Sequence, residues 1–132
     1  MNEKYHTYGF EKLNVWKLSI NLSKEIYELT DNFPAKEQFG LTSQIRRSAN
    51  SVCSNISEGA ARLGKRDGAR FYQIAFSSLM ETLNHLILSK NFHYLEEGSY
   101  IAARHRIDEI AKLLNGLHKS QMNYVSEPDV SY

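Results

Sequence analysis

The stretch FGLTSQIRRSANSVCSNISEGAAR, residues Phe39 to Arg62, decides the fold of this 132-residue chain. Apolar residues recur in it at every third or fourth position, namely Leu41, Ile45, Ala49, Val52 and Ile56. Residues at this spacing lie on one face of an α-helix. The pattern therefore predicts a helix over residues 38–59 with one buried face.

A stripe of polar residues runs beside this apolar face. Its members are Gln44, Ser48, Ser51, Asn55 and Glu58. Solvated helix faces are normally rich in charged side chains, whereas small hydroxyl and amide side chains let two helices approach closely and exchange hydrogen bonds. We therefore favour a packed polar seam over a solvated face, either inside one bundle or between subunits. Glu81 belongs to a matching polar set further along the chain. If the Glu81 carboxylate is buried, it needs a charged or hydrogen-bonding partner, and Arg47 and Asn55 are the candidates.

Three further helices are predicted from the same periodicity, and strand patterns are scarce. Asn32, which can take the left-handed cap conformation, and Pro34 mark the end of the first helix. Asp67 is the expected N-cap of the third helix, and acidic residues before Ser99 suit the start of the fourth. The predicted helices are 14–31, 38–59, 67–90 and 99–121, followed by a flexible tail over 122–132. Helices of this length with short connections predict an all-α, antiparallel up-and-down four-helix bundle, folded as a single domain over residues 1–132.

Charge is unevenly distributed along the chain, although 16 basic and 15 acidic residues give a net charge of only +1. A total so close to zero excludes a generic polyanion binder. Residues 41–70, however, contain six basic and two acidic residues, a net charge of +4. We expect any nucleic-acid contact in this stretch, first at the linker residues Arg62, Lys65 and Arg66, and then at Arg46, Arg47 and Arg70. For Arg46 and Arg47 the alternative role is pairing with Glu58 or Glu81.

Catalytic and metal-binding signatures are missing from the sequence. The single cysteine, Cys53, lies inside a predicted helix and excludes an internal disulfide. Glu81 and His85 are four residues apart, but no second such pair exists to complete a metal site in a bundle. We therefore expect no catalytic residue, no metal, no cofactor and no small-molecule substrate. No apolar run approaches the ~20 residues of a membrane helix and no hydrophobic signal region begins the chain, so we expect no membrane partner and a cytoplasmic location.

The stretch from Phe39 to Arg62 resembles the signature of the four helix bundle proteins that are encoded in intervening sequences of bacterial 23S ribosomal RNA genes. That signature reads Leu-Thr-x-Gln-x-Arg-Arg-Ala, then Ser, then Asn-Ile-x-Glu-Gly and a nearby Arg. The matching positions here are Leu41, Thr42, Gln44, Arg46, Arg47, Ser48, Ser51, Asn55, Ile56, Glu58, Gly59 and Arg62, with Ser48 where the family more often has alanine. The resemblance extends over about Phe10 to Leu117.

This resemblance implies a subunit of four up-and-down helices that assembles as a barrel-like homopentamer, and it implies a link to ribosomal RNA. A similar family, the accessory variability proteins of diversity-generating retroelements, shares the pentameric barrel and binds nucleic acid and a reverse transcriptase. Those relatives are strongly basic, whereas this chain has a net charge of +1. Two functions therefore stand as hypotheses. One is a non-catalytic, homo-oligomeric scaffold associated with RNA, and the other is a protein-binding adaptor without a nucleic-acid role.

Overall fold

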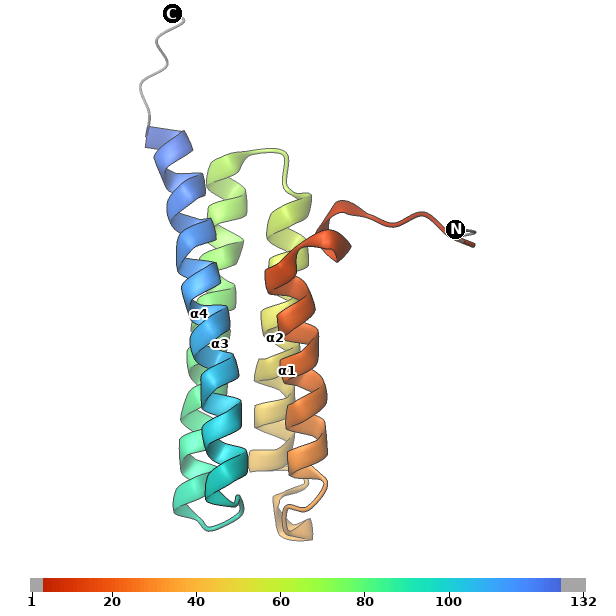
Figure 1. Ribbon diagram of the computed structural model, residues 1–132, viewed down its shortest axis with the longest axis vertical. Coiled ribbons are helices and arrows are strands. Elements are labelled where there is room, and N and C mark those ends of the chain that lie inside the picture. The colour runs from red at the N-terminus through yellow and green to blue at the C-terminus, as the bar shows by residue number, and fades with distance from the viewer. Residues whose placement is uncertain (1–3, 127–132) are drawn as a thin grey trace, which may run out of the picture.

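The computed structural model describes residues 4–126, with side chains over residues 4–123. These residues form four long helices and no strand: α1 (Asn14–Thr30), α2 (Leu41–Ala61), α3 (Lys65–Asn91) and α4 (Glu97–Ser126). Two short 3₁₀ turns precede α1 and α2, namely η1 (Gly9–Lys12) and η2 (Ala35–Glu37). The predicted all-α class with four helices is confirmed (Figure 1).

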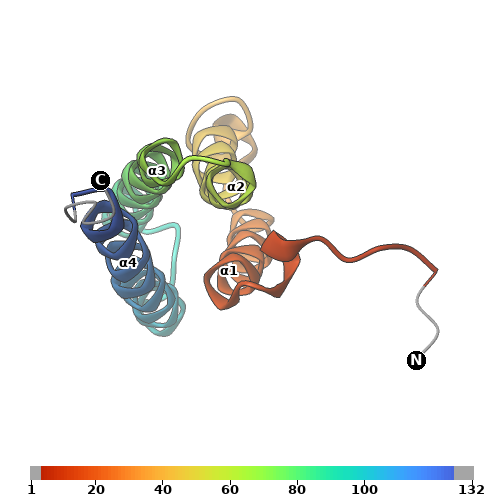
Figure 2. The same ribbon diagram turned by 90° about the horizontal axis from the view of Figure 1, so that it is seen from above.

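The helices run up and down in an antiparallel bundle (Figure 1). Each helix packs against the next one along the chain, and α1 also packs against α4. Seen from above, the four helices surround a common centre, and the chain before η1 leads away from them (Figure 2). The α2–α3 linker, the start of α1 and the end of α4 lie together at one end of the bundle, which we call the linker end. The α1–α2 and α3–α4 loops lie at the opposite end.

The predicted apolar face of α2 fills the centre of the bundle. Ile45, Ala49, Val52 and Ile56 are fully buried, and Leu41 is 8% exposed. The four fully buried residues pack in one cluster with residues of the other three helices, among them Leu22, Ile26, Leu79, Leu86, Ile107 and Ile110. Full burial of one large aliphatic side chain is worth about 1.5–3 kcal/mol. The periodicity that predicts the helix therefore also identifies the residues that α2 contributes to the core.

The bounds of α1 and α2 differ from the predicted ones. α1 ends at residue 30 rather than 31. Asn32 does not adopt the left-handed conformation that was expected of it. Among the described non-glycine residues, only His93 has a positive φ, of 65°. The Asp31 amide donates to the Tyr27 carbonyl and the Phe33 amide to the Thr30 carbonyl, so the last turn is satisfied without a left-handed residue. α2 covers residues 41–61 rather than 38–59.

The bounds of α3 and α4 also need correction. α3 begins at Lys65 rather than 67, and its N-cap is Gly64 instead of Asp67. The Asp67 carboxylate pairs instead with Arg62 at 3.7 Å and with Arg70 at 3.5 Å. α4 covers residues 97–126 rather than 99–121, because no helix breaker occurs before Pro128. Residues 122–126 of the predicted flexible tail are therefore helical, and residues 127–132 lie outside the described part of the chain.

Candidate nucleic-acid interface and helix–helix seam

The basic linker residues lie at the linker end, where α2 ends and α3 begins. Arg62, Lys65 and Arg66 are all exposed. The guanidinium of Arg62 pairs with Glu58 at 3.1 Å and with Asp67 at 3.7 Å, which neutralises part of its charge. The side chain of Arg66 makes no polar contact within residues 4–126. The three cations therefore share one end of the molecule but differ in how firmly they are held.

Arg70 joins this group from the next turn of α3. Its guanidinium lies 3.5 Å from the Asp67 carboxylate and 5.7 Å from the centre of the Phe71 ring, and its side chain is 70% exposed. Arg62 lies over the same ring at 4.3 Å. Exposed ion pairs of this kind contribute only about 0–1 kcal/mol. An anionic partner can therefore compete for both arginines at small cost.

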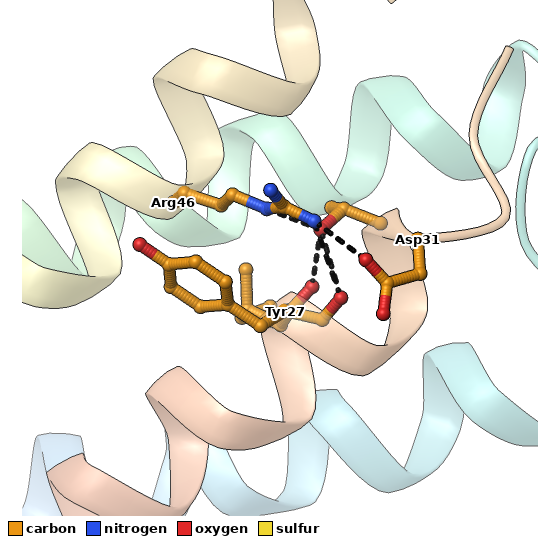
Figure 3. A network of polar contacts seen from close by, with 5 residues as sticks. Tyr27, Asp31 and Arg46 are labelled. Atoms are coloured by element: carbon orange, nitrogen blue, oxygen red, sulfur yellow. Dashed lines mark hydrogen bonds and ion pairs between the residues drawn. The ribbon is translucent and has the colours of Figure 1, made fainter. Parts of the chain in front are cut away.

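Arg46 has a structural role at the opposite end of the bundle (Figure 3). Its Nε donates to the Thr30 hydroxyl at 2.8 Å, and its Nη2 lies 3.0 Å from the Asp31 carboxylate. The same Nη2 donates to the Tyr27 carbonyl at 3.4 Å, and the guanidinium lies 4.5 Å from the centre of the Tyr27 ring. These contacts join α2 to the last turn of α1.

Arg47, the next residue, is exposed, and its side chain makes no polar contact within the described chain. It lines a shallow hollow beside Phe39. The predicted pairing of Arg46 or Arg47 with Glu58 or Glu81 is wrong. Glu58 lies at least about 16 Å further along the axis of the same helix, and the Glu81 carboxylate contacts a residue of its own helix. Neither arginine belongs to the linker end.

Part of the polar stripe of α2 lies in the contact with α3. The hydroxyl oxygens of Ser51 and Ser78 are 2.9 Å apart, and the Asn55 amide donates to the Ser51 carbonyl at 2.8 Å. The buried Thr82 hydroxyl donates to Ser48 Oγ at 2.8 Å and shares its proton with the Ser78 carbonyl at 2.9 Å. We call these five residues the polar seam. It lies between two helices of the same subunit.

The rest of the predicted stripe, Gln44 and Glu58, is exposed, and so is Glu81 of the matching polar set on α3. The side chain of Glu81 is 58% exposed and lies 3.3 Å from His85 Nε2. Glu81 therefore pairs with neither Arg47 nor Asn55, because a solvated carboxylate needs no buried partner. The side chain of His85 is only 8% exposed. Its Nδ1 atom is buried and has no hydrogen-bond partner among the described residues.

Two glycines allow α2 and α3 to approach each other, and sequence reasoning missed this role. A Cβ atom on Gly59 would lie 2.6 Å from Tyr72 Cε1 and 3.0 Å from the Gly68 carbonyl oxygen. A Cβ atom on Gly68 would lie 3.0 Å from the Gly59 carbonyl oxygen. The signal in the sequence was the glycine of the Asn-Ile-x-Glu-Gly motif. Only the packed helices reveal that this position excludes a side chain.

Cys53 and the histidines do not assemble into a reactive centre in the described residues. Cys53 is buried, and desolvation raises the pKa of its thiol although Ser23 lies 3.8 Å away. Within residues 4–126, no three His, Cys, Asp or Glu side chains gather as metal ligands would. No helix in that range combines the length and the apolar character needed to span a membrane.

The fold makes this chain a four-helix bundle protein, with exposed basic residues at one end and a hydrogen-bonded seam between two of its helices. The chain belongs to the family of 23S rRNA-intervening sequence proteins, whose model matches residues 11–116, and the resemblance seen in the sequence is confirmed. A protein of unknown function from the S23 ribosomal protein family of Bacteroides thetaiotaomicron has a similar structure, with a TM-score of 0.72 and 27% identity. The match covers 80% of this chain and 98% of that one. No curated protein matches the chain.

Proposed function

We propose that the protein is a non-catalytic scaffold that assembles as a homopentamer and binds RNA at the linker end of each subunit. The observation that carries the RNA contact is the grouping of exposed cations at this end, Arg62, Lys65, Arg66 and Arg70. α3 also starts here without a side-chain cap, so its first amide groups add positive potential. The family's name, which refers to 23S rRNA, supports RNA as the anionic partner.

The face formed by α1 and α2 supports assembly. Two adjoining hollows of about 590 and 420 Å³ lie on it and share Tyr27 and Asn50. The Phe39 side chain is 89% exposed and that of Tyr27 is 40% exposed. Large exposed apolar side chains with polar surroundings mark interaction sites. This face is therefore our candidate for the contact between neighbouring subunits.

A cyclic assembly strengthens the case for RNA binding by a chain of low net charge. Rotational symmetry repeats the linker end once in every subunit. The repeated cations then produce a ring whose field is stronger than the total charge of +1 per chain indicates.

Light scattering in moderate salt tests the assembly. We expect about 76 kDa, five times the subunit mass of 15.2 kDa. A mass equal to one subunit at micromolar protein would overturn the oligomeric scaffold.

Removing two linker charges tests the RNA contact. Lys65→Ala/Arg66→Ala should weaken the binding of a labelled single-stranded ribosomal RNA fragment, and the slope of log K against log salt should become shallower by about 0.7 per lost phosphate contact. Lys36→Ala/Lys90→Ala removes the same charge at the opposite end of the bundle and should leave affinity and slope unchanged. Fluorescence anisotropy over a salt series measures both. Equal effects of the two double variants would reject the linker end as the RNA site.

A protein-binding adaptor is the second candidate, favoured by the net charge of +1 and by the exposed Phe39 side chain. It predicts that the assembled protein retains no RNA fragment even at low salt. In that case the search moves to polypeptide partners of the α1–α2 face.

A further inference from the structure

A hollow of about 450 Å³ opens at the linker end, beside the basic residues. Its walls come from the segment before α1, the last turn of α2, the start of α3 and the end of α4. The volume falls within the range of small-ligand sites, about 300–1,000 Å³. Residues 59–61 form one wall, and their sequence Gly-Ala-Ala adds little side-chain bulk. The volume of the hollow and its small-residue wall therefore suit a flat ring system.

Aromatic rings stand at the rim and on the walls of this hollow. Tyr8 is 62% exposed, but its backbone is held because its amide donates to the Glu11 carboxylate at 2.8 Å. Phe10 packs edge-on against Trp16, with ring centres 5.2 Å apart, and Tyr72 lines the hollow from the buried side. Unpaired bases of RNA bind proteins by stacking on rings of this kind.

Cations and an amide lie around the same hollow. Lys65 and Arg62 both line it, and Gln121 contributes a side-chain amide that can donate and accept hydrogen bonds. The guanidinium of Arg62 contacts Glu58 and Asp67 through exposed ion pairs, which an incoming phosphate can replace at small cost. One nucleotide can be recognised by these groups together: the ring stacks on the base, the amide bonds to the base edge, and the two cations bind the phosphate.

We propose that this hollow binds one unpaired nucleotide of an RNA strand, with the base against Tyr8 and the phosphate near Lys65 and Arg62. The inference rests on the proposed RNA function and adds the class of RNA to it, single-stranded rather than fully paired. A duplex keeps its bases stacked on one another and offers none to the hollow.

Replacing Tyr8 tests the stacking. Tyr8→Ala should weaken the binding of a fluorescein-labelled oligoadenylate by about 5- to 150-fold, which is the loss of one base–aromatic stack. The salt slope should stay as in the wild type, because the ring carries no charge. Tyr5→Ala is the matched control, since Tyr5 is 76% exposed on the same segment and does not line the hollow. A fully paired RNA of equal length should bind more weakly and should not respond to Tyr8→Ala.

The outcomes separate this inference from the proposed function. Unchanged oligoadenylate binding by Tyr8→Ala, together with a loss in Lys65→Ala/Arg66→Ala, would overturn the nucleotide hollow and leave RNA binding at the linker end intact. Failure to bind any RNA would overturn both. Adenosine monophosphate serves as the competitor that distinguishes a free nucleotide from a strand. Displacement of the strand by an equal concentration of the monophosphate would assign the hollow to free nucleotides and reject the RNA assignment.

Discussion

Gly59 lies in the last turn of α2, where its backbone lies against α3. Gly59→Ala should lower the free energy of unfolding by about 1–3 kcal/mol through overpacking, although alanine favours a helix by about 1 kcal/mol over glycine. The clash cannot be relieved easily, because the ring of Tyr72 is 4% exposed and the other obstacle is the carbonyl of Gly68. Urea unfolding followed by circular dichroism measures the change.

Gly116→Ala is the matched control for this substitution. Gly116 is exposed in the interior of α4, and a Cβ atom there would meet nothing within 4 Å. This variant should be more stable than the wild type by about 0.5–1 kcal/mol. If Gly59→Ala is stabilised in the same way, α2 and α3 do not need the close approach that the structure shows.

Arg46 and Arg47 show how far neighbouring residues of one motif can differ. Successive residues of an α-helix are rotated by about 100° around its axis. Arg46 is therefore turned toward α1, where it contacts the Thr30 hydroxyl and the Asp31 carboxylate, whereas Arg47 is exposed. Residue type alone does not distinguish an arginine that joins two helices from one that meets solvent.

At the scale of elements, the polar seam joins α2 to α3. A double-mutant cycle of Ser51→Ala and Ser78→Ala should give a coupling free energy of about 0.5–1.5 kcal/mol, the net value of one hydrogen bond. The reason is the 2.9 Å contact between the two hydroxyl oxygens. Urea unfolding of the single and double variants measures the coupling.

Ser54 provides the control pair for the cycle. Its hydroxyl is exposed and donates to the Asn50 carbonyl of its own helix. Ser54→Ala combined with Ser78→Ala should therefore show additive effects. Additivity in the Ser51 pair as well would show that the Ser51–Ser78 hydrogen bond contributes nothing to the association of the two helices.

A carboxylate connects the two loops at the end opposite the linker. Glu37 accepts a hydrogen bond from the Tyr94 hydroxyl at 2.8 Å and from the Leu41 amide at 3.2 Å. The Tyr94 bond first, and then the Leu41 amide, lower the pKa of Glu37 below its ordinary value of 4.5. Because the pKa is lower in the folded state, this stabilisation is present above pH 4.5 and is lost as the pH falls through the lowered folded value.

Tyr94→Phe should therefore lose less thermal stability than the wild type on acidification from about pH 6 to about pH 3. The substitution removes the larger cause of the pKa shift and keeps the aromatic ring. Tyr27→Phe makes the same chemical change at a hydroxyl that accepts from Asn50 at 2.9 Å, so its acid response should equal that of the wild type. Thermal melts across this range measure the response. Parallel curves for all three proteins would contradict a titration of the Glu37–Tyr94 pair.

At the scale of the whole molecule, the two ends of the bundle differ in charge. At the linker end, Arg62 pairs with Glu58 and Asp67 and Arg70 pairs with Asp67. The four cations Arg62, Lys65, Arg66 and Arg70 therefore outnumber these two carboxylates. At the opposite end, Asp31 pairs with Arg46 and Glu97 with Lys90. A net charge of +1 therefore hides a polarised molecule. Symmetric assembly through the sides of the bundle would add the basic ends together.

Phe39→Ser tests whether the α1–α2 face is the subunit contact. Phe39 is 89% exposed in the subunit, so the change should leave the fold of one chain intact. If the ring is buried in the assembly, its removal costs about 1.5–3 kcal/mol of association free energy per contact. The assembly should then dissociate at protein concentrations about 10- to 100-fold higher than the wild type. Light scattering over a dilution series measures this shift.

Leu63→Ser is the control for Phe39→Ser. Leu63 is fully exposed but lies in the linker between α2 and α3, away from the α1–α2 face. The Leu63→Ser assembly should dissociate at the same protein concentration as the wild type. Identical dissociation of both variants would place the subunit contact elsewhere on the bundle.

Much of the fold could be predicted because helices are local. The spacing of Leu41, Ile45, Ala49, Val52 and Ile56 identified both a helix and its buried face. Helix ends were predicted less well, because they depend on partners outside the local sequence. Asp67, for example, pairs with two arginines instead of capping α3, and the Glu37 carboxylate accepts from the first amide of α2.

The sequence by itself determined the all-helical class, the apolar face of α2 and the family, since periodicity and motif are properties of residues that are near one another in the chain. The tertiary structure alone decided which polar residues join α2 to α3 and which cations remain at the surface. It also brought Tyr8 and Gln121, from distant parts of the sequence, next to the neighbouring cations Arg62 and Lys65. Such residues meet only when the helices pack, because packing, and not local spacing, sets which ends lie side by side.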